Sequence, residues 1–270
     1  MWSFRLETGG RWSCPVGGEG GWQLRGRREV GDAGGGEGQV GAIVAAAGTG
    51  TRLGKGSKAL VELNGRTTLA RAVTLFLTMD EISRIVVVGP PARLEAARRE
   101  AEALRPEKPV VVCPGGETRQ RSVHAGLQAL EGCEYVLVHD AARPMASQAL
   151  VRRVLAAARL TGAAIPGLPP RDAVKRVEGS RLVESLDRER MVLAQTPQGF
   201  RYQVLERAHF EAADAGLVGD DDAQLVMAAG HPVTVVPGEP TNIKLTTSED
   251  LVVLEALIRE RESSQAASPP

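Results

Sequence analysis

Residues Val40 to Lys58, VGAIVAAAGTGTRLGKGSK, form the stretch of sequence that decides the fold. The apolar run from Ala42 to Ala47 is typical of a strand that is buried on both faces inside a parallel sheet. The run ends at Gly48–Thr49–Gly50–Thr51–Arg52, where glycines let backbone N–H groups approach an anion closely. Because Arg52 and Lys58 add two fixed positive charges, this loop is suited to a nucleoside triphosphate.

Two better-known glycine motifs do not fit this loop. The dinucleotide fingerprint G-x-G-x-x-G needs a third glycine one place before Gly54. The P-loop pattern G-x-x-x-x-G-K-[ST] is not supplied by Gly50 to Lys55. Taken alone, the loop could also be a glycine-rich turn with solvated cations, so it needs support from elsewhere in the chain.

The composition narrows the classes of protein that the chain can belong to. Its 33 basic and 33 acidic residues balance, so the totals give no electrostatic footprint for nucleic acid or an anionic membrane. Aromatic residues make up only 3%, so the core must be aliphatic. No apolar run reaches the roughly 18 residues of a membrane span. The 3 cysteines contain no C-x-x-C pair, so neither disulfides nor zinc are expected, and we expect a cytoplasmic protein.

Residues 1–38 differ from the rest of the chain. Glycine forms about a third of this segment, against an average of about 7%, and no apolar periodicity is visible. We therefore expect a disordered Gly-rich extension over 1–38 and one folded domain over 39–262. The Ser-rich residues 263–270 should form a frayed tail.

From Val40 onward, predicted strands alternate with predicted amphipathic helices. Further strands are expected at 85–89, 109–113 and 135–139, and helices at 68–79, 92–104, 118–131 and 148–160. Repeated β–α units give an α/β fold with a parallel sheet and helices on both faces. Ligands bind outside the carboxyl ends of such strands, and three of those ends carry polar or glycine-rich residues, at 48–52, 115–122 and 140–143. That convergence supports the interpretation of the loop at 48–52 as part of a ligand-binding site.

After Pro166 the pattern changes. Residues 172–178 and 181–186 flank Gly179–Ser180 and predict a β-hairpin, which in an α/β chain is often an arm that packs on another subunit. Helices are expected at 202–213 and 221–229, a strand at 233–236 and a last helix from Ser248. The acids Asp220 to Asp222 are interpreted as partners of a helix dipole rather than a metal cluster, and His209 as a surface residue.

Seven short motifs occur in order along the chain and together carry a resemblance. They are AAAGTGTRL at 45–53, GGETRQRS at 115–122, VHDAARP at 138–144, RDAVKR at 171–176, LDR at 186–188, QTPQ at 195–198 and NIK at 242–244. Over residues 40 to about 258 the chain resembles the 2-C-methyl-D-erythritol 4-phosphate cytidylyltransferases of the non-mevalonate isoprenoid pathway. The resemblance implies a nucleotidyltransferase domain with a Rossmann-like, mostly parallel sheet, helices on both faces and a protruding hairpin arm at about 170–198.

The resemblance also implies a reaction, in which CTP and 2-C-methyl-D-erythritol 4-phosphate give the CDP-alcohol and pyrophosphate, with Mg²⁺ required. The nucleophile is a phosphate monoester whose second pKa is near 6, so no catalytic base is needed at neutral pH. Catalysis then depends on positioning and on positive charge placed where negative charge grows. This agrees with the lack of any obvious Ser-His-Asp or Cys-His set in the sequence.

Roles for individual residues follow from the resemblance. The residues expected to stabilise the transition state and hold the attacking phosphate are Arg52, Lys58, Arg188 and Lys244. The residues expected to contact the nucleotide are Ala46, Ala47, Gly48, Gly50, Gly116, Arg119, Ser122, Asp140 and Ala141. Arg143 and Thr196 should contact the alcohol substrate, and Asp140 is the expected Mg²⁺ ligand. The arm would form a homodimer in which Arg188 and Thr196 serve the partner's site. Strand alternation places His139 on the other side of the pleat from Asp140, so His139 should be structural.

Several alternatives stay open at the level of sequence. Either Lys55 or Lys58 could reach the pyrophosphate, although the register favours Lys58. Ala173 stands where the family often has threonine, so the acceptor could be another alditol phosphate such as ribitol 5-phosphate. A non-catalytic nucleotide-binding protein is a further possibility. A nicotinamide oxidoreductase is disfavoured, because the second strand ends at Val88–Gly89–Pro90 without an acid.

Overall fold

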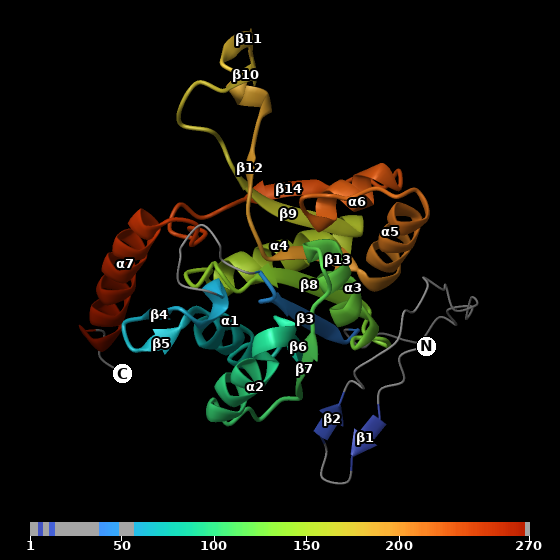
Figure 1. Cartoon of the computed structure of the whole chain (residues 1–270), viewed down its shortest axis with the longest axis vertical. Helices are drawn as coiled ribbons and strands as arrows, with labels where there is room; N and C mark the ends of the chain where they lie inside the picture. The colour runs from blue at the N-terminus through green and yellow to red at the C-terminus, as the bar shows by residue number, and fades with distance from the viewer. Residues whose placement is uncertain (1–4, 8–10, 14–37, 49–56, 268–270) are drawn as a thin grey trace.

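The computed structural model of the chain describes residues 5–7, 11–13, 38–48 and 57–267 (Figure 1). Its centre is a sheet in which four strands run parallel, in the spatial order β7–β6–β3–β8. Their bounds are β3 Val40–Ala45, β6 Ile82–Gly89, β7 Val110–Pro114 and β8 Tyr135–Asp140. Ala45 lies opposite both Val88 and Asp140, so the carboxyl ends of three strands meet at one edge.

Helices cover both faces of the sheet, as the alternating pattern predicts. On one face, α1 (Thr68–Leu77), α2 (Leu94–Ala103) and α4 (Gln148–Thr161) bury aliphatic side chains together with alternate residues of β3. The other face is covered by three further helices that bury aliphatic side chains against the sheet: α3 (Arg119–Gln128), α5 (Tyr202–Asp214) and α6 (Asp222–Ala228). Nearly all of β3 is buried, which explains its continuous apolar run. The predicted α/β fold is confirmed.

The second half of the sheet contains strands that the sequence pattern did not predict. They are β9 (Ala163–Leu168), β12 (Leu193–Ala194) and β13 (Gln198–Arg201), and β13 runs antiparallel to both β8 and β9. The predicted strand near 233–236 is observed as β14 (Thr234–Pro237), parallel to β9. The sheet is therefore mixed. Pro166 and Gly167 obscured β9, because both residues are depleted in strands.

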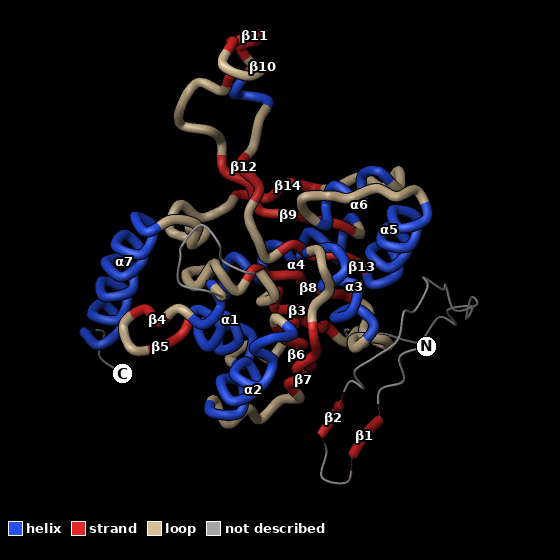
Figure 2. Tube along the Cα trace, viewed as in Figure 1, coloured by secondary structure: helices blue, strands red, loops and turns tan. Residues whose placement is uncertain are grey.

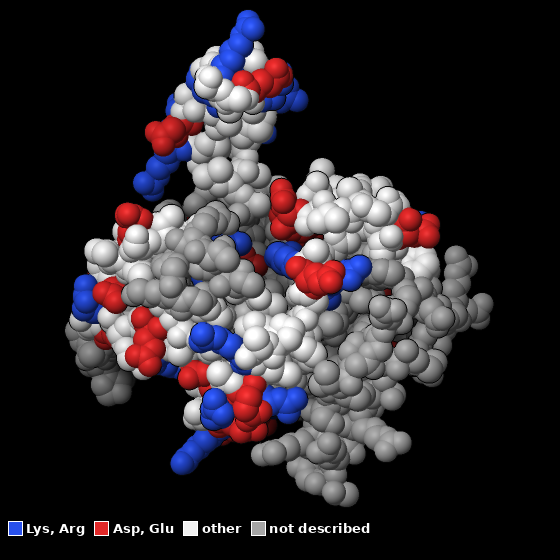
Figure 3. All heavy atoms as spheres, in the orientation of Figure 1, with Lys and Arg blue, Asp and Glu red and all other residues white. Residues whose placement is uncertain are grey.

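The hairpin is confirmed as β10 (Lys175–Glu178) paired antiparallel with β11 (Arg181–Ser185). It is followed by a 3₁₀ turn, η4 (Arg188–Arg190), and stands away from the body on two extended connections (Figure 2). Acidic and basic side chains are mixed on both the arm and the body on the face drawn in Figure 3. The arm therefore presents no surface of a single charge on that face.

The remaining elements are short apart from the last helix. They are β1 (Arg5–Glu7) with β2 (Arg11–Ser13), β4 (Glu62–Leu63) with β5 (Arg66–Thr67), and the 3₁₀ turns η2 (Lys58–Leu60) and η3 (Pro91–Arg93). Helix α7 (Ser248–Ala267) continues further than expected, into the segment taken to be a frayed tail. Most of residues 1–38 lie outside the described residues, so the disorder expected there stays a prediction. None of the described helices combines the length and the apolarity needed to cross a bilayer.

Candidate functional site

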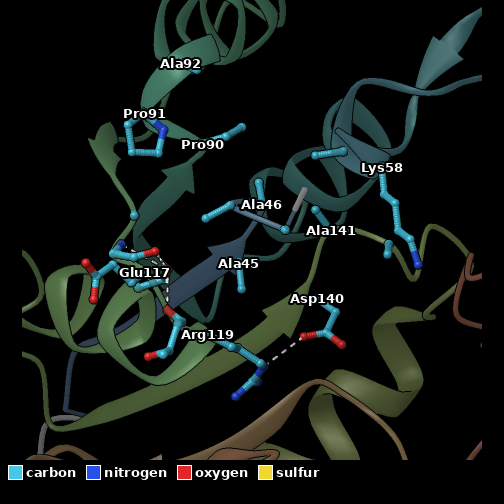
Figure 4. Close-up of a pocket in the computed structure, with 18 of the residues that line it drawn as sticks. Ala45, Ala46, Lys58, Pro90, Pro91, Ala92, Glu117, Arg119, Asp140 and Ala141 are labelled. Carbon is cyan, nitrogen blue, oxygen red and sulfur yellow. Dashed lines mark hydrogen bonds and ion pairs between the residues drawn. The ribbon is translucent and has the colours of Figure 1, made fainter. Parts of the chain in front are cut away.

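A cleft of about 800 Å³ opens at the carboxyl ends of β3, β7 and β8 (Figure 4). Ten residues singled out from the sequence line it: Ala46, Ala47, Gly48, Lys58, Gly116, Arg119, Ser122, Asp140, Ala141 and Lys244. Gly50, Arg52 and Lys55 lie outside the described residues. The structure thus gathers residues from five separate parts of the sequence around one space, at the edge where the topology predicts a ligand.

Close backbone approach shapes the wall of this cleft after β7. The N–H of Gly115 donates to the carbonyl of Gly89 at 2.8 Å, and a Cβ on Gly115 would lie only 2.4 Å from the Cβ of Ala47. The hydroxyl of Ser122 accepts from the N–H of Gly116 at 3.1 Å and lies 2.9 Å from the carbonyl of Thr118. Only glycine at 115 lets the two loops touch, and Ser122 fixes the second loop to the start of α3.

Asp140, the last residue of β8, lies between two cations. Its Oδ2 lies 2.7 Å from Nζ of Lys244 and its Oδ1 lies 3.4 Å from Nε of Arg119, an interaction drawn in Figure 4. Burial alone would raise the pKa of this carboxyl, but Arg119 and Lys244 outweigh burial and hold the pKa well below its ordinary value. Asp140 is therefore ionised at neutral pH and fixes the spacing of the two cations.

Lys58 also lines the cleft. It is the first residue of η2, and in Figure 4 its side chain extends on the side of the cleft where Asp140 lies. The carbonyl of Lys58 accepts a hydrogen bond from the buried hydroxyl of Thr68 at 2.8 Å, which ties η2 to the start of α1. This backbone contact fixes the position of η2, from which Lys58 lines the cleft.

Arg143, a predicted contact to the alcohol substrate, does not line the cleft. Its Nη1 donates to the carbonyl of Asn242 at 2.8 Å and its Nη2 to the carbonyl of Ala194 at 3.3 Å. Burial lowers the pKa of this guanidinium, although Asp140 acts in the opposite direction. Arg143 thus connects the base of the arm to the loop that carries Lys244, and its contact with substrate stays a prediction.

Thr196 and His139 form a hydrogen-bonded chain behind Asp140. The backbone N–H of Asp140 donates to Oγ1 of Thr196 at 3.0 Å, and that hydroxyl lies 3.0 Å from Nδ1 of His139. Nε2 of His139 lies 3.1 Å from the carbonyl of Arg143. Burial lowers the pKa of this imidazole to about 4, so the ring is neutral at pH 7. Because the carbonyl can only accept, Nε2–H donates to it, and Nδ1 of the neutral ring accepts from the hydroxyl.

This chain has two consequences for the predicted roles. His139 is fully buried and structural, as its place in the pleat indicates. Thr196 is also buried, and its hydroxyl is engaged within its own chain, so the geometry lends no support to the expectation that it serves a partner's site. Sequence reasoning missed the link, because it depends on the antiparallel pairing of Gln198 with Val138.

Arg188 and Ala173 lie on the arm rather than at the cleft. Both are exposed, and Nη1 of Arg188 donates to the carbonyl of Arg171 at 3.1 Å. Neither residue lines the cleft of its own chain. The contact of Arg188 with a ligand, expected from the sequence, therefore stays a prediction.

The acidic residues at the cleft suit a metal that is shared with a phosphate ligand. Among the described residues there is no cluster of three or more His, Cys, Asp or Glu side chains that could hold a metal ion. Asp140 and Glu117 are the carboxylates that line the cleft. Mg²⁺ commonly takes one or two carboxylates and completes its shell with water and substrate phosphates. The residues present fit that mode of binding and do not form an all-protein cage.

Comparisons with known proteins agree with this geometry. Residues 40–260 match the sequence profile described as "IspD: 2-C-methyl-D-erythritol 4-phosphate cytidylyltransferase". The enzyme of that name from Geobacillus kaustophilus is 40% identical over 221 residues, which is 82% of this chain and 97% of that protein. The "Bifunctional enzyme IspD/IspF" of Anaeromyxobacter dehalogenans is 46% identical over 239 residues, and the match covers 87% of this chain and 58% of that enzyme.

Solved structures of enzymes in this family also superimpose on the chain. The 2-C-methyl-D-erythritol 4-phosphate cytidylyltransferase of Thermus thermophilus superimposes with a TM-score of 0.66 at 40% identity, and the match covers 81% of this chain and 98% of that one. The 4-diphosphocytidyl-2C-methyl-D-erythritol synthase of Anaerococcus prevotii gives a TM-score of 0.74 at 28% identity, with coverage of 83% and 97%. These matches cover nearly the whole of each solved chain.

Proposed function

Since the chain belongs to the 2-C-methyl-D-erythritol 4-phosphate cytidylyltransferase family, we propose that it transfers the cytidylyl group of CTP to 2-C-methyl-D-erythritol 4-phosphate and releases pyrophosphate. One observation carries the proposal for this chain. Lys58, Arg119, Asp140 and Lys244 line the same cleft as the glycine-rich strand ends. The cleft therefore combines backbone amides and fixed cations, which is what a reaction between two anions requires.

In this reaction a phosphate oxygen of the acceptor attacks the α-phosphorus of CTP. An O–P bond forms there, the bond between the α-phosphorus and the bridging oxygen breaks, and pyrophosphate leaves with the electron pair. The attacking oxygen is largely deprotonated at neutral pH, so the enzyme does not need to remove a proton. The cleft-lining residues that the structure describes include neither histidine nor cysteine, in keeping with that mechanism.

The cations then act at different parts of the two substrates. We propose that Lys58 stabilises the departing pyrophosphate and that Lys244 holds the acceptor phosphate. The backbones of Ala46, Ala47 and Gly48 would contact the pyrimidine and phosphates, and Gly116, Arg119 and Ser122 the base and ribose. The same resemblance assigns Arg52 and Gly50 to the phosphates, although both lie outside the described residues.

We propose that Mg²⁺ is required and that Asp140, with Ala141 beside it, contacts the nucleotide and metal. Asp140 offers an ionised carboxylate at the strand end where the phosphates would lie. When bound, Mg²⁺ would neutralise phosphate charge during the transfer. Asp140 also keeps Lys244 and Arg119 a fixed distance apart, and this role does not depend on the metal.

We further propose a cytoplasmic homodimer in which the arm packs on the second copy. Two features support the dimer: Val177 and Leu182 on the arm are each 58% exposed, and Arg188 does not line the cleft of its own chain. In a dimer the partner's site could receive Arg188. The cytoplasmic location is supported by Cys113 and Cys133, which are buried free thiols.

The test is pyrophosphate release by the full chain with CTP and Mg²⁺, with three acceptor conditions run in parallel. 2-C-methyl-D-erythritol 4-phosphate should support turnover, whereas reactions without acceptor should not. Preferential turnover of ribitol 5-phosphate would replace the proposed acceptor with that alditol. Binding of CTP without release of pyrophosphate, whichever acceptor is added, would favour the non-catalytic alternative.

A further inference from the structure

A buried ion cluster lies directly behind the cleft, and Arg119 is the one member of it that also lines the cleft. The cluster consists of Arg119 on α3, Asp222 on α6 and His209 on α5. Nη1 of Arg119 lies 2.7 Å from Oδ2 of Asp222, and Nε2 of His209 lies 3.0 Å from Oδ1 of the same carboxylate. Asp222 and His209 are 0% exposed. The expectation that His209 lies on the surface was therefore wrong.

The sequence contained a signal that could have placed these residues correctly. Leu205, Ala208, His209 and Ala212 follow the i, i+3, i+4, i+7 spacing of one helix face, and all four are buried. Asp222 lies three and four residues before Leu225 and Val226, on the same face of α6, and those two residues are also buried. Reading each residue by its polarity instead of by its helical position caused the error.

Asp222 is not needed to start its helix. The preceding residue, Asp221, is the N-cap of α6, and its side chain accepts from the N–H of Gln224 at 2.9 Å. Both oxygens of Asp222 are instead directed to His209 and Arg119. A fully buried carboxylate carries a large desolvation cost, and replacing buried ion pairs with apolar residues is often neutral or stabilising. Helix capping therefore does not explain why Asp222 is an acid.

Arg119 connects this buried cluster to the cleft. Its guanidinium uses Nη1 for Asp222 behind the cleft and Nε for Asp140 at the cleft, while Nη2 is buried without a hydrogen-bond partner among the described residues. A guanidinium held at two of its nitrogens has little rotational freedom. Its orientation in the cleft is thus set from behind by Asp222, whose own position is set by His209.

We propose that Asp222, held by His209, is a positioning residue that fixes the guanidinium of Arg119 for CTP binding. The inference rests on the proposed function, because it assigns Arg119 to the nucleotide. Asp222 acts on the binding of CTP through Arg119 and does not touch either substrate. Acceptor binding and the chemical step, which depend on Lys244 and Lys58, are affected much less.

The test compares full-length wild-type protein with Asp222→Asn. Calorimetric titration with CTP and Mg²⁺ gives the Kd, and pyrophosphate release gives kcat and the two KM values. Loss of the negative charge that pairs with Arg119 predicts that Kd and KM for CTP rise about tenfold or more. We expect kcat and the KM for the acceptor to change less than about threefold, because those interactions are made elsewhere. Equal changes in all four constants would overturn the proposal.

Asp221→Asn is the matched control, because it makes the same chemical change one residue away at the cap of the same helix. It should lower the melting temperature without weakening CTP binding. A loss of CTP affinity equal to that of Asp222→Asn would mean that the stability of α6, not the orientation of Arg119, is what matters. If wild-type protein binds CTP but releases no pyrophosphate, the proposed function fails, whereas the positioning role is still judged from the CTP Kd values of wild type and variants.

A double-mutant cycle supplies the sharpest readout. In an Arg119→Ala background, Asp222→Asn should cause no further loss of CTP affinity, since its effect passes through the missing guanidinium. Additive losses would show that Asp222 acts independently of Arg119. Should Asp222→Asn fail to fold, His209 offers a second route: His209→Gln keeps a donor toward Asp222 and should bind CTP better than His209→Leu. Equal CTP affinity of these two variants would contradict the proposal.

Discussion

The ammonium group of Lys244 lies 2.7 Å from a carboxylate oxygen of Asp140, which joins the loop before α7 to the end of β8. The other oxygen of that carboxylate lies 3.4 Å from Arg119. One buried acid therefore separates the cation proposed for the acceptor phosphate from the cation proposed for the nucleotide. This arrangement lets the two cations approach without repelling each other and keeps both at the cleft.

Lys244→Gln should weaken binding of the acceptor more than binding of CTP. Loss of a charge-assisted contact to phosphate predicts a rise of about tenfold or more in the KM for the acceptor. Steady-state kinetics with each substrate varied in turn would measure this effect. Lys108→Gln is the matched control, because Lys108 donates to the carbonyl of Met79 and does not line the cleft. A larger change in the KM for CTP would contradict the assignment.

Lys58→Ala should lower kcat by about 100-fold or more, equivalent to roughly 2.7 kcal/mol, with a smaller change in CTP affinity. The reason is that negative charge grows on the departing pyrophosphate, so the ammonium contributes most in the transition state. Rapid-quench or steady-state measurements would supply kcat, and calorimetry the CTP Kd. Lys55→Ala is the companion variant. If Lys58→Ala retains full activity and Lys55→Ala loses it, the role belongs to Lys55.

The free energy of unfolding should fall as the pH is lowered from about 6.5 toward 4. Burial lowers the pKa of both His139 and His124 to about 4 from an ordinary value of 6.5, and repulsion from His209 adds to the effect at His124. Between these values the unfolded chain binds protons that the folded chain does not. Stability is therefore complete above the unfolded pKa and decreases by up to about 1.4 kcal/mol per pH unit for each histidine.

Urea unfolding at several values between pH 7 and pH 4 would measure this slope. His124→Gln should make the slope shallower, whereas His231→Gln, on the loop before β14, serves as the control. The carboxyl of Asp140 adds a further loss of stability only at lower pH, because its folded pKa is held below its ordinary value of 3.8. A free energy of unfolding that does not change between pH 6.5 and 4 would contradict the burial of neutral imidazoles.

Gly115→Ala should weaken CTP binding by separating the two loops that form the cleft. The new methyl group would lie 2.4 Å from the Cβ of Ala47 and 2.8 Å from Oγ of Ser122, so one of the loops has to move. Overpacking of this kind costs about 1–3 kcal/mol, and here the displaced groups are those proposed to hold the nucleotide. Calorimetry with CTP and thermal unfolding, measured together, would detect the change. Unaltered CTP affinity would mean that the loops are not held in contact when CTP binds.

Deleting residues 1–38 should leave turnover and melting temperature unchanged. The matched region of the family begins at residue 40, and the first backbone bonds to the sheet come from the carbonyl of Gln39, which accepts from Glu134 and Tyr135. Pyrophosphate release and thermal unfolding of the truncated and complete chains would provide the comparison. A large loss of either would show that the short pair β1–β2 or its surroundings belong to the folded domain.

Local periodicity was enough to predict the parallel half of the sheet and its helices. Val40–Ala45 and Tyr135–Asp140 are recognisable from sequence because strands buried on both faces need continuous apolar residues. β9 and β13 were not recognisable, since Pro166 and Gly167 interrupt the first and the second is only 4 residues long. The antiparallel pairing of β13 with both β8 and β9 is a long-range contact that no local pattern encodes.

The sequence by itself determined that polar strand ends converge at one edge, because β–α units with right-handed crossovers align the carboxyl ends of their strands. Only the tertiary structure decided which charges meet there. Lys244 reaches Asp140 through a loop, and Asp222 reaches Arg119 through the packing of α5 against both α3 and α6. Such pairings depend on how helices and loops pack across the sheet, and on distances of a few ångströms that helical and strand periodicity do not specify.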